Sequence, residues 1–428
     1  MKLILSAGRV IDPANKVNDI LDLLIEDGKI KKVGKGIKDK DAEIIKVNGK
    51  IVAPGLIDMH VHLREPGFEY KETIASGVRA AVKGGFTSVA CMPNTEPVMD
   101  NTAVVELVIS KGKKEKLANV FPIASISKGA KGEEISDIGM LIKCGAIALS
   151  DDAAPIMNAE IMRRAFEYIK QFDLPIITHC EDKNMTADCV MNESFSSTVL
   201  GLRGMASAAE SIMVYRNIAL ADYIGAPVHI AHVSCKESVE IIRWAKKQGI
   251  RVTAETAPHY FCLTDAAVKN YDTNTKMNPP LRTAEDVLAL KAALKDDTLD
   301  CIASDHAPHG RTDKELEFNY AAFGIIGLET MLALTLTELV HKKILTLEKA
   351  IEKLSYSPAK ILRLNRGTLS LGAAADISVI DTEKEYTIDT GKFESKSKNS
   401  PFNGWKVKGE AFMTIIDGNI KMKEGKIL

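Results

Sequence analysis

The sequence predicts an α/β protein: a (β/α)8 barrel joined to a small composite β-sandwich domain built from the N- and C-terminal segments. Three observations support this. Eight short apolar runs alternate with helix-like segments in the middle of the chain, and both ends resemble short strands broken by glycine turns. The 428 residues, 46% of them hydrophobic, suffice for a barrel of about 250 residues plus a smaller unit. The expected parts are 1–53 and 365–428 for the β-sandwich and 54–364 for the barrel.

The two ends of the chain carry the same turn chemistry. Asp27-Gly28 separates LLIE from KIKKVG, and Asp417-Gly418 lies between FMTII and NIKMK. An Asp-Gly pair between alternating segments is a hairpin signal, because both residues tolerate positive φ. Strands at both termini around a long α/β middle predict that the two ends form one β-domain.

The middle of the chain is predicted to form eight β/α units. Helical spacing of apolar residues marks helices over 159–170 and 207–223. No glycine-rich dinucleotide fingerprint follows the first strand, which favours a closed barrel over an open sheet. The eight expected strands lie near 56–61, 86–91, 119–125, 146–150, 175–179, 227–232, 250–255 and 300–304. The expected apolar faces are Ile161, Ala165, Phe166 and Ile169 in the first helix, and Ile212, Tyr215, Ala219 and Tyr223 in the second.

Composition excludes several classes of partner. The 56 basic and 57 acidic residues give a net charge of -1, so neither nucleic acid nor a membrane surface is an expected partner. The seven cysteines are scattered singly, which predicts reduced thiols. The N-terminal apolar stretch is too short for a signal peptide or a membrane span. We therefore expect a cytoplasmic enzyme with a small-molecule substrate.

Function in such a barrel lies at the carboxyl ends of the strands. The first run ends in His60-Val61-His62-Leu63-Arg64. Side chains two positions apart on a strand point the same way, so His60, His62 and Arg64 share a face if the extended geometry persists to Arg64. Two adjacent imidazoles suit a divalent transition metal.

Four further runs end in histidines or carboxylates. They end in Asp151-Asp152, in His179, in His232, and in Asp305, which His306 and His309 follow. Their collection at one end of five strands predicts a metal site. The residues alone do not decide between Asp151 and Asp152 as a ligand.

The other histidines are interpreted as structural. His229 precedes His232 by three positions, so strand alternation places it on the opposite face. His259 is expected to pack near the site, and His341 to face solvent on a helix. Asn94, Asn278, stiffened by the prolines that follow it, and the Phe323-Gly324 turn are candidates for substrate contact, although Asn94 could equally be a turn former.

The motifs HVHLREPG, MPNT, SDD, THCED, AHVS, NPPLR, SDHAPH and GLET, in this order, resemble those of the bacterial class I dihydroorotases of the amidohydrolase superfamily. The resemblance covers essentially the whole chain. It implies two Zn²⁺ ions per chain, bridged by Asp152 and a hydroxide. The implied metal ligands are His60, His62, Asp152, His179, His232 and Asp305.

The resemblance also assigns roles around the metals. Asp305 would be the catalytic acid and base, and Asp151 would support the site. The implied substrate-binding residues are His62, Arg64, Asn94, Asn278, His309, Phe323 and Gly324. Departures from the family pattern occur at Ala153, Arg203, Ala206, Tyr260 and Ala322; they concern loop conformation, and every implied metal-ligand position is filled.

The implied reaction is the reversible hydrolysis of dihydroorotate to N-carbamoyl-aspartate in pyrimidine biosynthesis. One alternative is another cyclic amidase, a hydantoinase or allantoinase, but many of these carry a bridging lysine where this chain has an aspartate. A second alternative is an inactive scaffold for aspartate transcarbamoylase, which would be expected to lose metal ligands. A homodimer and an association with aspartate transcarbamoylase are the expected protein partners.

Overall fold

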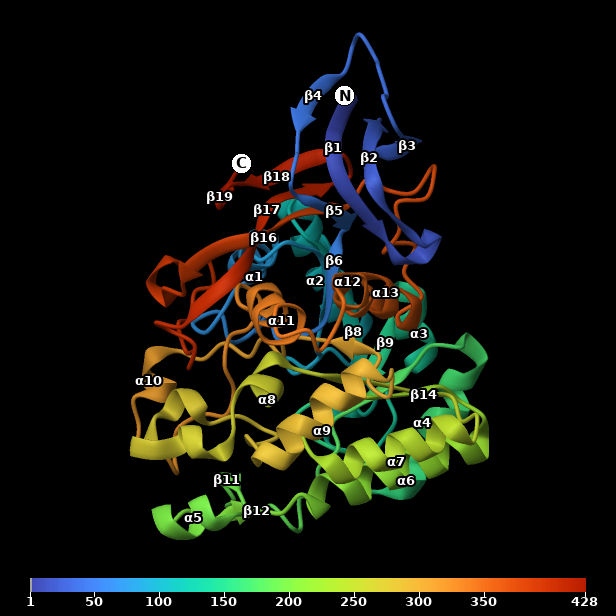
Figure 1. Cartoon of the computed structure of the whole chain (residues 1–428). Helices are drawn as coiled ribbons and strands as arrows, with labels where there is room; N and C mark the ends of the chain where they lie inside the picture. The colour runs from blue at the N-terminus through green and yellow to red at the C-terminus, as the bar shows by residue number, and fades with distance from the viewer. Residues whose placement is uncertain (1) are drawn as a thin grey trace.

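The computed structural model describes residues 2–428 and shows a barrel with a β-sheet domain at one end (Figure 1). The eight barrel strands pair in chain order, all in parallel. A parallel bridge between Val61 and His306 joins the first strand to the segment after the last. The strands are β6 (Leu56–Val61), β7 (Phe86–Cys91), β8 (Asn119–Ser125), β9 (Ala148–Ser150), β10 (Ile176–Thr178), β13 (Val228–Ile230), β14 (Val252–Thr256) and β15 (Cys301–Ile302). The predicted (β/α)8 barrel is confirmed, and each strand coincides with an expected run, with β14 ending one residue beyond its run.

Helices surround the barrel and cover its outer face. Asn158 caps α4 by accepting hydrogen bonds from the first backbone N–H groups of the helix, as expected of an N-cap asparagine. The main helices are α1 (Ile74–Lys83), α2 (Thr102–Glu115), α3 (Ile138–Cys144), α4 (Ala159–Ile169), α6 (Ala208–Ile224), α7 (Lys236–Lys247) and α9 (Ala284–Lys295). Shorter ones are α8 (Pro258–Cys262), α10 (Arg311–Lys314), α11 (Met331–Thr335), α12 (Leu347–Ile351) and α13 (Ser357–Ile361).

The predicted core face is right for α4 and wrong for α6. Ala165, Phe166 and Ile169 of α4 are fully buried. In α6 the buried side is formed instead by Ala209, Met213, Val214, Ile218 and Ala221. The expected face of α6 points to solvent, with exposed fractions of 51% at Ile212, 53% at Tyr215 and 79% at Tyr223. This helix carries apolar residues on more than one side, so spacing alone could not choose the side that packs.

Apolar side chains fill much of the barrel interior. Met59, Ala90, Ile123, Ala148 and Ile177 belong to one buried cluster and come from five successive strands. These packed side chains close the barrel axis, so the polar side chains at the strand ends lie above an apolar layer.

The β-domain is a single nine-stranded mixed sheet in which both ends of the chain take part (Figure 1). Antiparallel pairing of β5 with β16 joins the N-terminal strands to the C-terminal ones. Both predicted Asp-Gly hairpins are present, with positive φ at Asp27, Gly28, Asp417 and Gly418. The strands are β1 (Lys2–Asp12), β2 (Val17–Glu26), β3 (Lys29–Gly34), β4 (Glu43–Lys46), β5 (Ile51–Pro54), β16 (Ile377–Thr387), β17 (Lys406–Ile416), β18 (Asn419–Lys423) and β19 (Lys426–Ile427).

The segment between β10 and α6 extends away from the barrel. It contains β11 (Met191–Asn192), α5 (Phe195–Leu200) and β12 (Gly204–Met205), and it lies far from the β-domain in Figure 1. Within the described part of the chain, no helix has the length and apolar character needed to cross a bilayer.

Candidate metal centre and substrate pocket

The carboxyl ends of five barrel strands bring the six predicted ligands together. All six side chains are buried, with residue exposures of 8% or less. His60 belongs to β6, and the other five lie just beyond the strands that precede them. The ligands after these strands are His62 after β6, Asp152 after β9, His179 after β10, His232 after β13 and Asp305 after β15.

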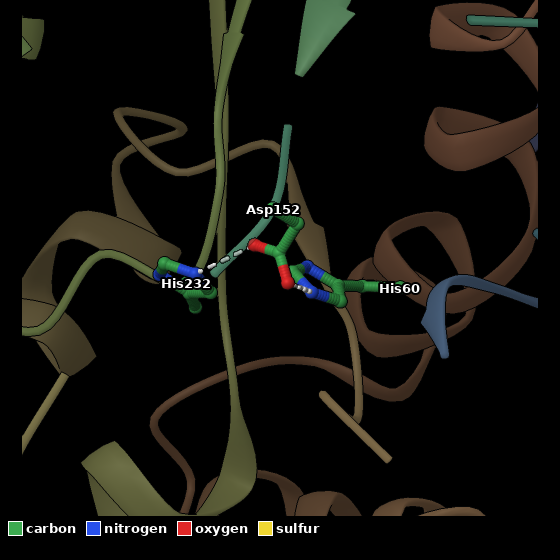
Figure 2. Close-up of side chains that lie close together, drawn as sticks. All are labelled: His60, Asp152 and His232. Atoms are coloured by element: carbon green, nitrogen blue, oxygen red, sulfur yellow. Dashed lines mark ion pairs between the residues drawn. The ribbon is translucent and has the colours of Figure 1, made fainter. Parts of the chain in front are cut away.

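Asp152 lies at the centre of the four imidazoles. Its Oδ2 is 3.5 Å from His60 Nε2 and 3.4 Å from His62 Nε2. Its Oδ1 is 3.6 Å from His179 Nδ1 and 3.4 Å from His232 Nε2. Figure 2 shows the carboxylate between His60 and His232, with one oxygen toward each ring. Each carboxylate oxygen thus faces a different histidine pair, which is the arrangement that a bridging ligand requires.

Asp305 completes the pair formed by His60 and His62. Its Oδ1 lies 3.2 Å from His62 Nε2 and 3.6 Å from His60 Nε2. The backbone of Asp305 has a φ of +47°, in the left-handed region that costs a non-glycine residue energy. The chain therefore holds this carboxylate at the mouth of the barrel in a strained conformation.

Three of the four imidazoles use their other ring nitrogen to hold their orientation. His60 Nδ1 donates to Glu255 Oε1 at 2.7 Å, and His179 Nε2 donates to Glu181 Oε2 at 2.9 Å. His62 Nδ1 lies 2.8 Å from Asn94 Oδ1 and donates to it. A hydrogen-bond acceptor on the far nitrogen is typical of metal-ligating histidines, because it fixes the tautomer and the ring orientation.

The residues at this centre fit divalent cations. Two sets have ligand atoms close enough to share an ion: His60, Asp152 and His232, and His60, His62 and Asp305. Among the described residues, His60 Nε2 and Asp152 Oδ1 are buried without a hydrogen-bond partner. Buried polar atoms without partners are costly, and a cation would satisfy both. Imidazole and carboxylate donors are those that zinc accepts.

Electrostatics keep the central carboxylate ionised. Burial raises the pKa of Asp152, but the neighbouring imidazoles of His60 and His232 outweigh it and hold that pKa well below its usual range. An ionised carboxylate is the form that binds a metal.

Asp151 turns away from this centre. Its Oδ1 accepts hydrogen bonds from Ser125 Oγ and from the Ile126 amide, both at 2.7 Å, and from the Ser127 amide at 3.2 Å. Burial raises the pKa of Asp151 to about 6. This carboxylate therefore anchors the end of β8, and the structure separates the roles of the two adjacent aspartates.

A pocket of about 850 Å³ opens above the metal centre. Five of the six predicted metal ligands line it, and the sixth, His60, is buried beneath it. The other predicted substrate-binding residues also line it: Arg64, Asn94, Asn278, His309, Phe323 and Gly324. The predicted residues therefore share one pocket, while their contacts with a substrate remain predictions.

Arg64 reaches the pocket by a different route from the expected one. β6 ends at Val61, and Arg64 has a φ of +63°, so the extended geometry does not persist. Its Nε donates to Pro308 O at 3.1 Å, and its Nη2 lies 3.3 Å from His309 Nε2. Burial lowers the pKa of Arg64 to about 10. Among residues 2–428, no carboxylate forms an ion pair with this buried guanidinium.

The His309 ring is held neutral beside Arg64. Its Nε2 donates to Phe323 O at 2.7 Å. Burial and the cations Arg64, Lys71 and Lys314 lower the pKa of His309 to about 2. The ring therefore contributes shape and hydrogen bonding to the pocket wall rather than charge.

The two asparagines and the Gly324 amide already have protein partners. Asn94 orients His62, and Asn278 Nδ2 donates to Glu181 Oε2 at 2.9 Å. The Gly324 amide donates to Lys276 O at 3.0 Å. The expected backbone donation to substrate from Gly324 would have to replace this hydrogen bond, whereas Asn278 Oδ1 is buried without a partner and remains available.

The structure corrects two interpretations of the remaining histidines. His229 and His232 do not lie on opposite faces, because His232 has a φ of +34° that breaks the strand alternation. His229 pairs in register with Ile177 of the barrel interior and contacts Glu255, with Nε2 3.3 Å from Oε2. His341 is half-buried rather than free in solvent, and its Nε2 donates to Thr382 O at 2.9 Å.

Two other positions behave as structural supports. His259 is buried against Tyr260, with ring centroids 4.1 Å apart, in agreement with its predicted packing role. Tyr260, one of the departures from the family pattern, donates its hydroxyl to Pro279 O at 2.7 Å. This bond supports the loop that carries Asn278.

Sequence reasoning missed Glu255 and Glu181, which hold His60 and His179 from behind. Their exposed fractions are only 1% and 4%. A carboxylate inside a predicted buried strand needs a partner, so Glu255 in VTAET carried a usable signal. Glu181 lay in the quoted THCED motif without an assigned role.

Comparison with known proteins agrees with this geometry. Residues 49–238 match the family model described as Dihydro-orotase-like. A dihydroorotase of Geobacter metallireducens is 55% identical over 99% of this chain and 100% of its own length. One of Acetivibrio thermocellus is 51% identical over 100% of both chains.

Solved structures share the fold. The L-hydantoinase (dihydropyrimidinase) of Arthrobacter aurescens superposes with a TM-score of 0.88 at 24% identity, covering 100% of this chain and 97% of that one. A dihydropyrimidinase of Brevibacillus agri gives a TM-score of 0.86 at 23% identity, covering 100% and 96%. The similarity to the dihydroorotases extends over the full length at more than half identity, and this chain therefore belongs to the dihydroorotase family.

Proposed function

We propose that this protein is a dihydroorotase, which hydrolyses the ring amide of dihydroorotate to N-carbamoyl-aspartate and catalyses the reverse cyclisation. The observation that carries the proposal is one pocket holding both a cation-binding cluster and a buried arginine without a carboxylate partner. The full-length identity to proteins named dihydroorotase supports the same conclusion.

We propose two zinc ions as the cofactors. His60, His62 and Asp305 would hold one, His179 and His232 the other, and Asp152 would bridge them through its two oxygens. Two divalent cations in this position supply a water of lowered pKa and polarise the amide carbonyl.

Asp305 is the proposed proton carrier. It lines the pocket and lies beside His60 and His62, so it would be close to an amide and a water held at the proposed cation site. It takes a proton from the attacking water and returns it to the ring nitrogen as the C–N bond breaks. The carbonyl carbon gains the hydroxyl group and becomes a carboxylic acid, which releases its proton to solvent at neutral pH, and the ureido nitrogen carries the transferred proton.

Arg64 is the proposed anchor for the carboxylate of the substrate. A buried guanidinium without an anionic partner is costly, and the ring carboxylate would provide that partner. The planar fork of arginine suits a bidentate contact. Asn94, Asn278, His309 and the Phe323–Gly324 backbone would fix the ring around this anchor.

The structural neighbours named hydantoinase supply the competing activity. Many such enzymes carry a bridging lysine, whereas the residue after β9 in this chain is Asp152. A ring substrate without a carboxylate would also leave Arg64 without an anionic partner. The test compares zinc-loaded enzyme on dihydroorotate, hydantoin and allantoin at equal concentrations. We expect turnover of dihydroorotate to exceed that of the other two by at least about 100-fold, the discrimination expected of a charged polar contact. Faster hydrolysis of hydantoin would reject the proposal.

We further propose a homodimer in the cytoplasm, with an association with aspartate transcarbamoylase. Two-fold dimers are the commonest assembly of soluble chains. The seven cysteines carry free thiols, which suits a reducing compartment. Sedimentation of the purified chain alone tests the homodimer, and a monomer would contradict it. Sedimentation of its mixture with aspartate transcarbamoylase tests the association, and separate sedimentation of the two proteins would contradict it.

A further inference from the structure

A short segment between β16 and β17 lies against the wall of the substrate pocket. We call this segment, residues 395–399, the buttress. Ser395, Ser397 and Asn399 are buried, with exposures of 1%, 5% and 5%, while the two lysines between them are exposed. The segment belongs to no strand, but its buried and exposed residues alternate, so every second side chain is turned inward. The inward face is polar, so its hydrogen bonds must be satisfied by whatever it covers.

The first part of the buttress holds the chain that follows the HVHLREPG motif. Ser395 Oγ donates to Glu72 Oε2, and the amide of Lys396 donates to Glu72 Oε1 at 3.0 Å. Ser397 Oγ donates to Lys71 O at 2.6 Å. These bonds fix the backbone beside Lys71, whose Nζ donates to His309 Nδ1 at 3.4 Å.

Asn399 holds two separate stretches of the pocket wall with one amide group. Its Nδ2 donates to Ala307 O at 3.1 Å and to Gly324 O at 3.0 Å. Its Oδ1 accepts from the His309 amide at 3.2 Å. Its backbone carbonyl accepts from the Ile326 amide at 3.0 Å. The side chain thereby ties the loop after β15 to the Phe323–Gly324 turn.

These two stretches carry the part of the pocket that surrounds Arg64. The His309 ring donates to Phe323 O across the gap that Asn399 closes, and the Arg64 guanidinium lies against the same ring. A shift of either stretch would move His309 and with it the position of the guanidinium. Asn399 itself does not line the pocket, so it acts only through these neighbours.

We propose that Asn399 is a positioning residue that sets the preference of this enzyme for a carboxylated ring. It aligns His309 and the Phe323–Gly324 turn so that Arg64 meets the carboxylate of the substrate. The inference deepens the proposed function and rests on it.

The experiment compares two substrates, dihydroorotate and its neutral carboxamide analogue, in wild-type, Asn399→Ala and Asn399→Asp enzymes. The ratio of the two kcat/KM values does not depend on the concentration of folded enzyme, so partial unfolding cannot mimic the effect. Asn399→Asp keeps the volume and the acceptor oxygen but sets a carboxylate against two carbonyl oxygens. Asn403→Ala is the matched control, because Asn403 is exposed, accepts from the Thr390 amide and hydroxyl, and does not line the pocket.

We expect the preference for dihydroorotate to fall about tenfold in Asn399→Ala, the effect of losing one or two neutral hydrogen bonds, with a larger fall in Asn399→Asp. The loss should appear as a raised KM for dihydroorotate, with zinc content unchanged. The Asn403→Ala control should keep the wild-type ratio. An unchanged ratio in both Asn399 variants, even at reduced total activity, would overturn the inference. No hydrolysis of dihydroorotate by zinc-loaded wild-type enzyme would instead reject the proposed function.

Discussion

Glu255 should control how tightly the metal centre binds zinc, although it touches no substrate. The carboxylate is 1% exposed and accepts from His60 Nδ1 at 2.7 Å, while its second oxygen faces His229. Burial raises the pKa of Glu255, but the neighbouring imidazoles of His229 and His60 outweigh it and lower that pKa to about 2. The group is therefore ionised at neutral pH and makes a charge-assisted hydrogen bond.

The magnitude of a Glu255→Gln change follows from that bond. A hydrogen bond to a charged group contributes about 1.5–3 kcal/mol and a neutral one about 0.5–1.5 kcal/mol. The substitution keeps the shape and loses roughly 1–1.5 kcal/mol, which corresponds to about a tenfold weaker zinc affinity. This agrees with the roughly 10–100-fold losses typical of such supporting residues.

The assay is zinc competition with a chromophoric chelator, on wild-type, Glu255→Gln and a control Glu240→Gln. Glu240 is an exposed glutamate on α7, so its substitution should leave zinc affinity unchanged. Equal affinities for wild-type and Glu255→Gln would refute the reasoning that this carboxylate tunes His60 as a ligand.

Three further substitutions test other parts of the site and the fold. Arg64→Ala should raise the KM for dihydroorotate by about 10–100-fold, the loss of a charge-assisted contact, with full zinc content; unchanged kinetics would contradict its role. Asp305→Asn should lower kcat by about 10²–10⁴-fold, and wild-type turnover would rule it out as the proton carrier. Burial raises the pKa of Glu329 to about 7, so the folded state binds more protons than the unfolded state between pH 4.5 and 7, and stability falls as pH rises through that range. Because Gln can still accept the Glu394 and Ser395 amides, Glu329→Gln should remove about 3 kcal/mol of this pH dependence in urea unfolding; parallel pH profiles would contradict it.

Much of the fold followed from local pattern. The barrel strands lie where short apolar runs are bounded by turn residues, since a strand buried on both faces has no other sequence signature. The Asp-Gly hairpins were also predicted from local sequence. The buried face of α6 could not be predicted in this way, because the choice between its two apolar sides depends on which neighbour packs against them.

The convergence of the candidate residues was predictable from the sequence, but their detailed geometry was not. Residues at strand ends converge by topology alone, which explains why the six proposed ligands meet. Strand alternation did not predict the side-chain directions of Arg64 and His232. Both residues have positive φ, which turns the chain out of the extended conformation that alternation assumes. Glu255 lies 195 residues from His60 in the sequence, and Asn399 lies 90 residues from His309. Their contacts are therefore visible only in the folded structure.

We propose that Asp152 divides four imidazoles into two cation sites. Anomalous diffraction at the zinc absorption edge, from crystals of the zinc-loaded enzyme, would locate the ions. We expect two peaks, one between His60, His62 and Asp305 and one between His179 and His232, with an oxygen of Asp152 toward each. A single peak, or peaks away from Asp152, would contradict it.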